Sequence, residues 1–373
     1  MRMRVISLMA ASCVAAAVSA TAQAAEYVYG SWVGPNNPVL AKGIVPYFQA
    51  VENDTGGSLK WRILAGGQLF GGPATLAGIR DRIADAGGPV IPAFTRKELR
   101  AANVVYDLVN ASESPVAMAG AVTETFHLNC PECKQDFANN NALFIANYAT
   151  TRFNILCRDP IKTLADAKGR KMRVVGALGR FIKSVGAVPV GGSPAAAVEA
   201  LQRGSMDCIV GPIEWLQGFG LWDITKHVLD APLAIQPTPA SMVINRDIWT
   251  KLSKAERAAL IKQAPGLVVG VTINGYMAED AEVRAEAAKR GVTITEASAE
   301  ARKALEGHKA NEPKVIAHTA KKEGVKDPEA IIKAHLTNVQ KWEKIQARIG
   351  DDPNAFAKAL WDEVFSKLDP EKM

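Results

Sequence analysis

The first third of the chain alternates between two patterns of hydrophobic and polar residues. Residues 26–32 (EYVYGSW) and 58–64 (SLKWRIL) alternate residue by residue, as β-strands do. Between them, apolar residues recur at helical spacing: Leu40, Ile44, Tyr47, Phe48 and Val51. A glycine-rich loop at 65–73 then leads into a helix predicted from 73 to about 83 and a short strand within 83–90. The pattern therefore predicts two successive strand–helix–strand units.

The middle of the chain repeats this alternation. Strands are predicted at 152–157 (RFNILC), 171–175 (KMRVV) and 206–210 (MDCIV). Thr163 with Asp166 caps a short helix, and Ser193 before Pro194 opens another that ends at Gly204. Alternating strands and helices are typical of parallel sheets covered by helices. We therefore predict an α/β fold built on a mostly parallel sheet flanked by helices, repeated in each lobe if the chain forms two.

Beyond residue 245 the pattern changes to long amphipathic helices, with starts predicted at Asp327-Pro328 and Asp352-Pro353. Their apolar stripes are Ile331, Ile332, Leu336, Val339, Trp342 and Ile345 in the first helix, and Phe356, Leu360, Val364 and Leu368 in the second. No internal repeat or low-complexity linker is present. Two lobes would therefore be joined by several chain crossings rather than by a flexible tether.

The N-terminus has the pattern of a bacterial secretory signal. Two arginines precede an apolar run over 5–18 and a small-residue cleavage site at 22–24 (AQA). Residues 1–24 are therefore predicted to be a cleaved signal peptide, and the mature protein to be periplasmic. The lipoprotein alternative, which would use Cys13, leaves too short an apolar run. No later apolar run reaches the ~18 residues of a membrane span.

The net charge and the length of the chain limit the classes of function and the number of domains to consider. The chain holds 44 Lys and Arg against 38 Asp and Glu, so removing Arg2 and Arg4 with the signal leaves a net charge of 42 − 38, about +4. The basic residues are scattered among acids and lack interleaved aromatics, which argues against a nucleic-acid partner. With 48% hydrophobic residues the chain can bury a large core, and its length indicates two domains.

Four cysteines follow the predicted signal: Cys130, Cys133, Cys157 and Cys208. An even count in an oxidising compartment indicates disulfides, with three connectivities open. We predict Cys130 with Cys133, which lie in one turn, and Cys157 with Cys208, which lie on strands expected in one lobe. One alternative is a zinc site formed by His127, Cys130 and Cys133, but it lacks a fourth ligand. A second alternative is a redox CxxC motif formed by Cys130 and Cys133. We expect no metal and no cofactor.

Common enzyme motifs are absent from the sequence. It contains no HExxH, no G-x-S-x-G, no Walker lysine and no GxGxxG, and the loop at 65–73 lacks the lysine and hydroxyl of a phosphate cradle. Most aromatic residues at helical spacing, such as Phe219 and Trp222, are simply interpreted as core. The sequence therefore favours a binding protein over an enzyme.

Arg173 is a candidate binding residue because of its place in a strand. It lies inside the strand predicted at 171–175, which helices should cover on both faces, so its guanidinium needs an anion. The anion is either a protein carboxylate in a buried salt bridge or a ligand carboxylate held in bidentate geometry. The residue pattern leaves both possibilities open.

Several segments together resemble the substrate-binding subunits of tripartite ATP-independent periplasmic (TRAP) transporters. The similar segments are residues 48–87, which include Gly66-Gly67-Gln68-Leu69, and residues 160–176, 185–212 and 244–260. Each motif is weak alone, but their order and spacing make the resemblance specific. It implies a two-lobed periplasmic binding protein fold that closes on a small organic acid, with a long C-terminal helix backing both lobes.

The resemblance also implies domain boundaries and partners. We expect lobe I at 25–149 and 237–277, lobe II at 150–236 and 278–312, and C-terminal helices spanning the lobes at 313–373. The expected function is capture of a carboxylate and its delivery to TRAP membrane subunits by a monomeric receptor. The alternatives are a receptor of the same fold that serves a sensor or an ABC permease, and a secreted CxxC oxidoreductase.

The family's carboxylate-binding arginine falls on Arg173, and a second family arginine matches Arg152 if the alignment slips by one residue. Gly211 stands where the family often has asparagine, Glu214 either supplies an acceptor or caps the following helix, and Trp215 offers a flat wall. Trp32, Gln68 and Phe70 are expected to close the opposite side. This set favours an acid with an apolar or aromatic body and a nearby hydroxyl or ammonium, and not a sialic-acid-like polyol.

Overall fold

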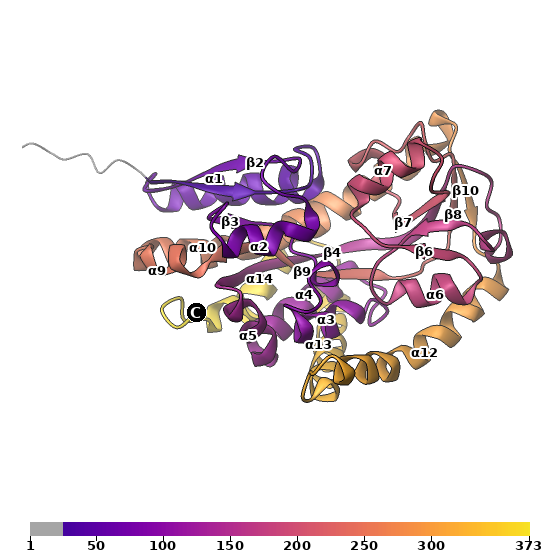
Figure 1. Ribbon diagram of the computed structural model, residues 1–373. Helices are drawn as coiled ribbons and strands as arrows, with labels where there is room; N and C mark the ends of the chain where they lie inside the picture. The colour runs from indigo at the N-terminus through magenta and orange to yellow at the C-terminus, as the bar shows by residue number, and fades with distance from the viewer. Residues whose placement is uncertain (1–24) are drawn as a thin grey trace, which may run out of the picture.

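The computed structural model describes residues 25–373, in which two long strands connect two groups of short ones (Figure 1). The predicted signal peptide and Cys13 lie outside the described residues. The strands are β1 (Ala25–Gly30), β2 (Leu59–Leu64), β3 (Ala86–Gly87), β4 (Ala142–Cys157), β5 (Lys171–Arg173), β6 (Val188–Val190), β7 (Cys208–Pro212), β8 (His227–Asp230), β9 (Ile235–Asn245) and β10 (Thr293–Glu296).

The strand order is β2-β1-β3-β9-β4-β7-β5-β6, and β8 pairs with both β4 and β10. The strands of the predicted strand–helix–strand units pair in parallel: β1 with β2 and β3, and β5 with β6 and β7. By contrast, β4 is antiparallel to β9, β7 and β8. The sheets are therefore mixed, because the chain crosses between the two groups along β4 and returns along β9 in the opposite direction.

Helices cover both groups of strands. The α-helices are α1 (Val45–Asp54), α2 (Thr75–Arg80), α3 (Arg100–Asp107), α4 (Pro115–Glu124), α5 (Pro131–Asn139), α6 (Leu178–Ser184), α7 (Pro194–Gln202), α8 (Trp215–Gly218), α9 (Arg246–Lys251), α10 (Lys254–Val269), α11 (Ala278–Ala287), α12 (Ala299–Lys322), α13 (Pro328–Ile349) and α14 (Pro353–Glu363). Wider π-type turns form η1 (Val39–Ile44), η4 (Thr125–Asn129) and η6 (Gly270–Met277), and short 3₁₀ turns form η2 (Gly72–Ala74), η3 (Pro92–Phe94), η5 (Leu164–Ala167), η7 (Ala288–Arg290) and η8 (Phe365–Lys367).

The helix starts at predicted capping residues are present. Ser193 accepts a hydrogen bond from a backbone N–H in the first turn of α7, and Asp327 and Asp352 do the same for α13 and α14. Thr163 and Asp166 form a capping box on η5. These local signals identify the helix starts because capping depends only on neighbouring residues.

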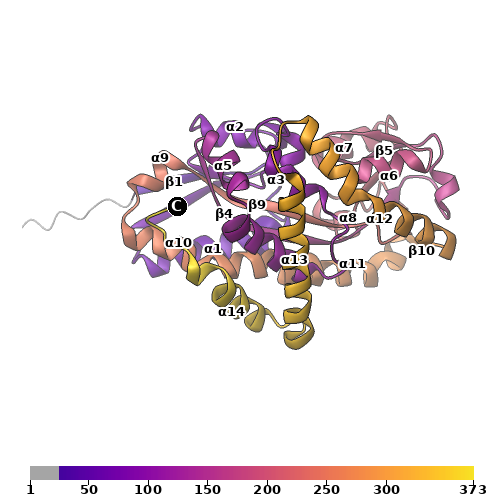
Figure 2. The ribbon, with the colours of Figure 1, turned by 90° about the horizontal axis from the view of Figure 1, so that it is seen from below.

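Long helices connect the two groups of strands (Figure 2). α10, η6 and α11 follow one another without a break; α10 packs against α1, and Arg284 of α11 bonds to Asp230 of β8 at 2.6 Å. α12 contacts α3, and its Glu312 is ion-paired with Arg180 of α6. α13 packs chiefly against α4. The C-terminal helices therefore contact elements of both groups.

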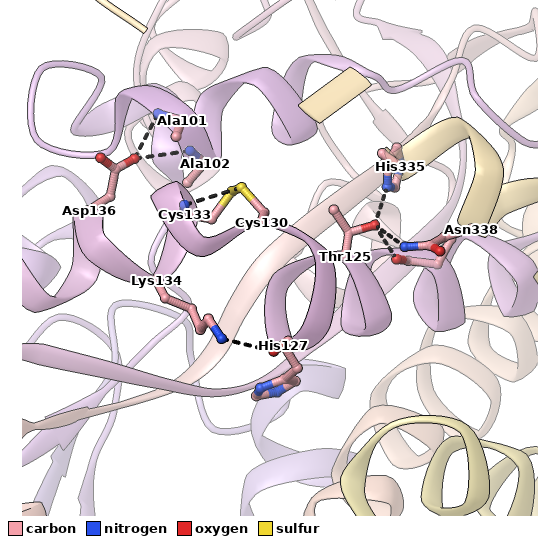
Figure 3. The surroundings of a disulfide bond; sticks show 11 residues. Ala101, Ala102, Thr125, His127, Cys130, Cys133, Lys134, Asp136, His335 and Asn338 are labelled. Carbon is pink, nitrogen blue, oxygen red and sulfur yellow. Dashed lines mark hydrogen bonds between the residues drawn. A yellow bond between two sulfur atoms is a disulfide. The ribbon is translucent and has the colours of Figure 1, made fainter. Parts of the chain in front are cut away.

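Both predicted disulfides are present, and all four cysteines are buried. Cys157 and Cys208 face each other in the register of β4 and β7, so this disulfide joins neighbouring strands. Cys130 and Cys133 close the turn that starts α5 (Figure 3). Within residues 25–373, no helix is long and apolar enough to cross a membrane.

Candidate ligand-binding site

Arg173 is almost completely buried, with 3% of its surface exposed, at the end of β5. Its Nε donates a hydrogen bond to the Gly192 carbonyl at 2.8 Å, and its Cζ lies 5.4 Å from the centre of the Trp215 ring. Among the described residues no carboxylate forms an ion pair with it. The guanidinium is thus oriented by a backbone carbonyl and an aromatic ring, and its Nη1 and Nη2 groups remain available to another acceptor.

A cavity opens beside Arg173 between the two groups of strands. One part of its wall comes from the N-terminal segments and includes Trp32, Asn37, Phe94 and Tyr106; another comes from β5 to α8 and includes Arg173, Pro194, Trp215 and Phe219. The long strands complete it with Tyr148, Thr150, Phe153 and Gln236, and η6 adds Tyr276. Elements far apart in the sequence therefore build a single site.

Half of the residues in the cavity wall are aromatic, and several of their rings contact one another. The Trp215 ring packs against Phe153 and Phe219 at centroid distances of 5.6 and 5.2 Å. Tyr148 and Tyr276 stack at 5.6 Å. The centre of a water molecule can occupy about 50 Å³ of the cavity, several times the ~10–15 Å³ that one water needs. The site therefore suits a small, flat molecule.

The electrostatics of the cavity favour an anion. Among residues 25–373 no Asp or Glu lines it, and burial lowers the pKa of Arg173 to about 10, partly offset by Tyr106. A pKa near 10 keeps the guanidinium charged at neutral pH. A buried charge without a protein counter-ion is costly, so an anionic ligand at this position would be strongly stabilised.

Asn37 supplies a second polar group to the cavity. Its Oδ1 accepts a hydrogen bond from the Val39 backbone at 3.1 Å, which fixes the orientation of the amide. Its Nδ2 is buried and has no acceptor within the described part of the chain. Thr150, also in the wall, accepts a hydrogen bond from the Gln236 backbone at 3.1 Å. Asn37 thus brings a fixed, buried donor without an acceptor to the cavity wall.

Glu214, expected either to supply an acceptor to the site or to cap α8, lies outside the cavity wall. It is fully buried, its side chain makes no capping hydrogen bond to α8, and both carboxyl oxygens lack partners among residues 25–373. The carboxyl group folds back against Gly218, where an added Cβ would overlap it. Burial raises the pKa of Glu214 well above its ordinary value, and the charges of Glu279 and Asp280 add to the increase.

Replacing Glu214 with glutamine should stabilise the protein at higher pH. Because the folded-state pKa of Glu214 is raised, the folded chain binds more protons, and the parent loses stability as the pH rises above the unfolded-state pKa, by at most about 1.4 kcal/mol per pH unit. Glutamine does not ionise and avoids this loss. Urea unfolding of both chains between about pH 4 and pH 8 measures the difference. The exposed Glu300→Gln is the control, and equal pH slopes for Glu214→Gln and the parent would contradict the expectation.

Three of the predicted site residues line the cavity, namely Arg173, Trp215 and Trp32. Arg152 does not, because register shifts in β4 between Ala149 and Arg152 turn its side chain outward. It is 47% exposed and bonds to Glu113 at 3.3 Å. Gly211 lies under the Trp215 ring, which an added Cβ would overlap, so its contribution is the space for that ring.

The two remaining predicted residues lie in the glycine-rich loop and also miss the cavity. Gln68 is exposed. Phe70 is buried against Gly30 and Gly78, where an added Cβ would overlap its ring. Phe70 therefore fills core space between β1 and α2. The expectation that these side chains close the site took the position of the loop from the resemblance, and the cavity wall does not include them.

The residues that the sequence did not single out share no local motif. They include Asn37, Tyr106, Tyr148, Thr150, Phe153, Gln236 and Tyr276. Most belong to long strands or helices in which apolar spacing indicates only burial. An asparagine before a proline, as at Asn37, usually indicates a turn and gives no indication of a buried unused donor.

The sequence matches bacterial extracellular solute-binding protein family 7 (DctP) over residues 30–316, more than half of the chain. The chain belongs to this family. It is therefore a TRAP solute-binding protein, a transport receptor and not an enzyme, and such proteins bind a small solute and work with TRAP membrane subunits. Proteins of this family are periplasmic. Cys130 and Cys133, the pair considered for redox chemistry, form a buried disulfide.

Solved TRAP binding proteins share the fold. One from Bordetella bronchiseptica, with bound (R)- and (S)-mandelate, is 20% identical, with 85% of this chain and 99% of that chain covered and a TM-score of 0.72. A marine metagenome protein in complex with 3-hydroxybenzoate is 21% identical, with 86% and 99% covered and a TM-score of 0.75. A marine metagenome protein with co-purified pyroglutamate is 18% identical, with 84% and 99% covered and a TM-score of 0.71.

Proposed function

We propose that this binding protein captures a small aromatic carboxylate in the periplasm, after removal of the signal peptide 1–24, and delivers it to TRAP membrane subunits. The observation that carries the proposal is Arg173, which is buried beside an aromatic cavity with no carboxylate bonded to it among the described residues. In the proposed complex, Nη1 and Nη2 hold the ligand carboxylate in two parallel hydrogen bonds.

The aromatic body of the ligand is supported by the walls of the cavity. Rings prefer edge-to-face or offset contacts, and Trp215, Phe153 and Phe219 already adopt such contacts among themselves. A benzene ring between these walls would continue the same packing. Two of the solved relatives bind mandelate and 3-hydroxybenzoate, whereas the third binds pyroglutamate, so aromatic and non-aromatic rings are the two classes to compare.

A substituent that accepts a hydrogen bond is favoured on the ligand. The unused Nδ2 of Asn37 is a donor, so it would pair with a hydroxyl or carbonyl oxygen. Leaving that buried donor unpaired costs free energy, which selects against ligands without a suitable oxygen. This replaces Glu214 as the expected determinant of specificity, because the carboxyl group of Glu214 does not line the cavity.

We further propose that the two groups of strands are lobes that close on the ligand, with lobe I at 25–149 and 237–277, lobe II at 150–236 and 278–312, and spanning helices at 313–373. The cavity takes residues from both proposed lobes. The crossing strand β4 contains register shifts between Phe144 and Arg152, and irregular pairing of this kind is where a strand bends most readily. The protein would act as a monomer, since one chain builds the whole cavity.

Thermal unfolding with a panel of acids tests the ligand class. Benzoate, 3-hydroxybenzoate and mandelate are compared with pyroglutamate, cyclohexanecarboxylate and the neutral benzamide. At about 100 times the dissociation constant a bound ligand adds about 2.7 kcal/mol, which raises the melting temperature by several degrees. We expect the largest shift from 3-hydroxybenzoate or mandelate and none from benzamide. Larger shifts with the non-aromatic acids, or equal shifts with benzoate and benzamide, would contradict the proposal.

A further inference from the structure

A second cavity lies against α5, and it shares no residue with the cavity at Arg173. Its wall is formed by η4, α5, the start of β4, α9 and the last residues of the chain. The centre of a water molecule can occupy about 320 Å³ of it, more than in the first cavity. We infer that this cavity is a second binding site, for a medium-chain carboxylate with an alkyl tail and a single negative charge.

One part of the wall of the second cavity is apolar, whereas its remaining lining residues are polar or charged, namely His127, Lys134, Gln135, Arg246 and Lys372. Phe137 of α5 and Phe144 of β4 are buried with their rings 6.0 Å apart, and both line the cavity. Leu143 and Leu368 are half-buried on other parts of the wall. Transfer of an alkyl chain from water to such a wall is favourable, and the gain grows with each methylene. An alkyl tail of several carbons therefore fits the chemistry of this apolar part.

Cations without acidic partners line the same cavity beside its apolar part. Lys134 donates only to the His127 carbonyl, at 3.1 Å, and the guanidinium of Arg246 has no hydrogen bond or ion pair in the described part of the chain. No Asp or Glu of the described residues lines the cavity, and Lys372 bonds to Asp369, which lies outside it. Two unpaired cations beside an apolar wall complement a carboxylate on an alkyl chain.

The wall is held in shape before any ligand arrives (Figure 3). The Cys130–Cys133 disulfide closes the turn that starts α5. Asp136 of α5 accepts hydrogen bonds from the backbone N–H groups of Ala101 and Ala102, at 2.7 and 3.1 Å. These contacts fix α5, and with it Lys134 and Phe137, to neighbouring helices. A preformed wall reduces the entropy lost on binding. Fixing α5 in place is a role for residues 130–133 (CPEC) that the first cavity does not explain.

Calorimetry with octanoate tests the inference in the full chain carrying Arg173→Ala, so that the first cavity lacks its anion anchor. We expect one bound octanoate per chain. The double substitution Lys134→Ala with Arg246→Ala should weaken binding at least about tenfold. The matched control, Lys303→Ala with Arg348→Ala, removes the same charges from exposed side chains that form no ion pair within residues 25–373, and should leave the affinity unchanged.

A third variant tests the contribution of the cavity separately from that of the two cations. Ala138, half-buried in the wall, is replaced with phenylalanine to fill the cavity while both cations remain. Octanoate binding should be lost, while an unchanged melting temperature shows that the chain still folds. Binding that survives Ala138→Phe, or that falls equally in the charge control, would overturn the inference. Binding only to anionic lipid vesicles, dependent on Lys134 and Arg246 but not on Ala138, would identify a membrane-facing surface instead and also overturn it.

Discussion

Replacing Arg173 with alanine should weaken binding of the preferred carboxylate by about 100-fold or more. In the bound state the change leaves a buried carboxylate without its partner, which typically costs ~3–5 kcal/mol. In the free protein the same change removes a buried cation that has no carboxylate partner among the described residues. The stability of the unliganded chain should therefore fall little or rise. Calorimetry with the acid that gave the largest thermal shift measures the first effect, and urea unfolding measures the second.

Arg152→Ala is the matched control, because it removes the same charge from an exposed side chain on β4, which β7 separates from β5. Its affinity should stay within about twofold of the parent, as exposed ion pairs contribute little. The ligand affinity of Arg173→Lys should lie between those of the parent and Arg173→Ala, since an ammonium cannot form the two parallel hydrogen bonds. Near-parent affinity of Arg173→Ala would overturn the assignment of the carboxylate to this residue. A large loss of stability without ligand would indicate that Arg173 is mainly structural.

Loss of the Cys157–Cys208 disulfide should destabilise the protein more than loss of Cys130–Cys133. The first bridges a sequence separation of 51 and the second a separation of 3. Chain entropy in the unfolded state then predicts losses of about 4 and about 2 kcal/mol, respectively. The measurement compares urea unfolding of the two double alanine variants, Cys157→Ala/Cys208→Ala and Cys130→Ala/Cys133→Ala.

The two variants control for each other, since all four cysteines are fully buried and each pair loses two sulfur atoms. A common packing cost therefore cancels in the difference between them. A greater loss for the Cys130–Cys133 pair would contradict the entropic argument. It would show that fixing α5 against its neighbours matters more to the fold than closing the longer loop.

The sequence predicted much of the local structure of this protein. Helix starts at Ser193, Asp327 and Asp352 depend on a side chain and a backbone N–H a few residues apart, so capping residues reveal them. The strand–helix–strand units could also be predicted from the sequence, because apolar periodicity reflects burial along one element. The antiparallel course of β4 and β9 was not predicted, because strand direction depends on pairing between distant segments.

Some features of the candidate site could likewise be predicted from the sequence, whereas others depend on the tertiary structure. Arg173 could be identified from the sequence because a cation inside a covered strand is costly wherever the strand packs, and because the surrounding residues resemble a family motif. The orientation of Arg152 depended on register shifts in β4, and the position of Glu214 on how its turn folds back against Gly218. Asn37 became a candidate only when the fold buried its Nδ2 without an acceptor. Sequence thus determined which residues carry charge and where helices and strands begin, whereas the tertiary structure decided which side chains meet, because that depends on contacts between segments far apart in the chain.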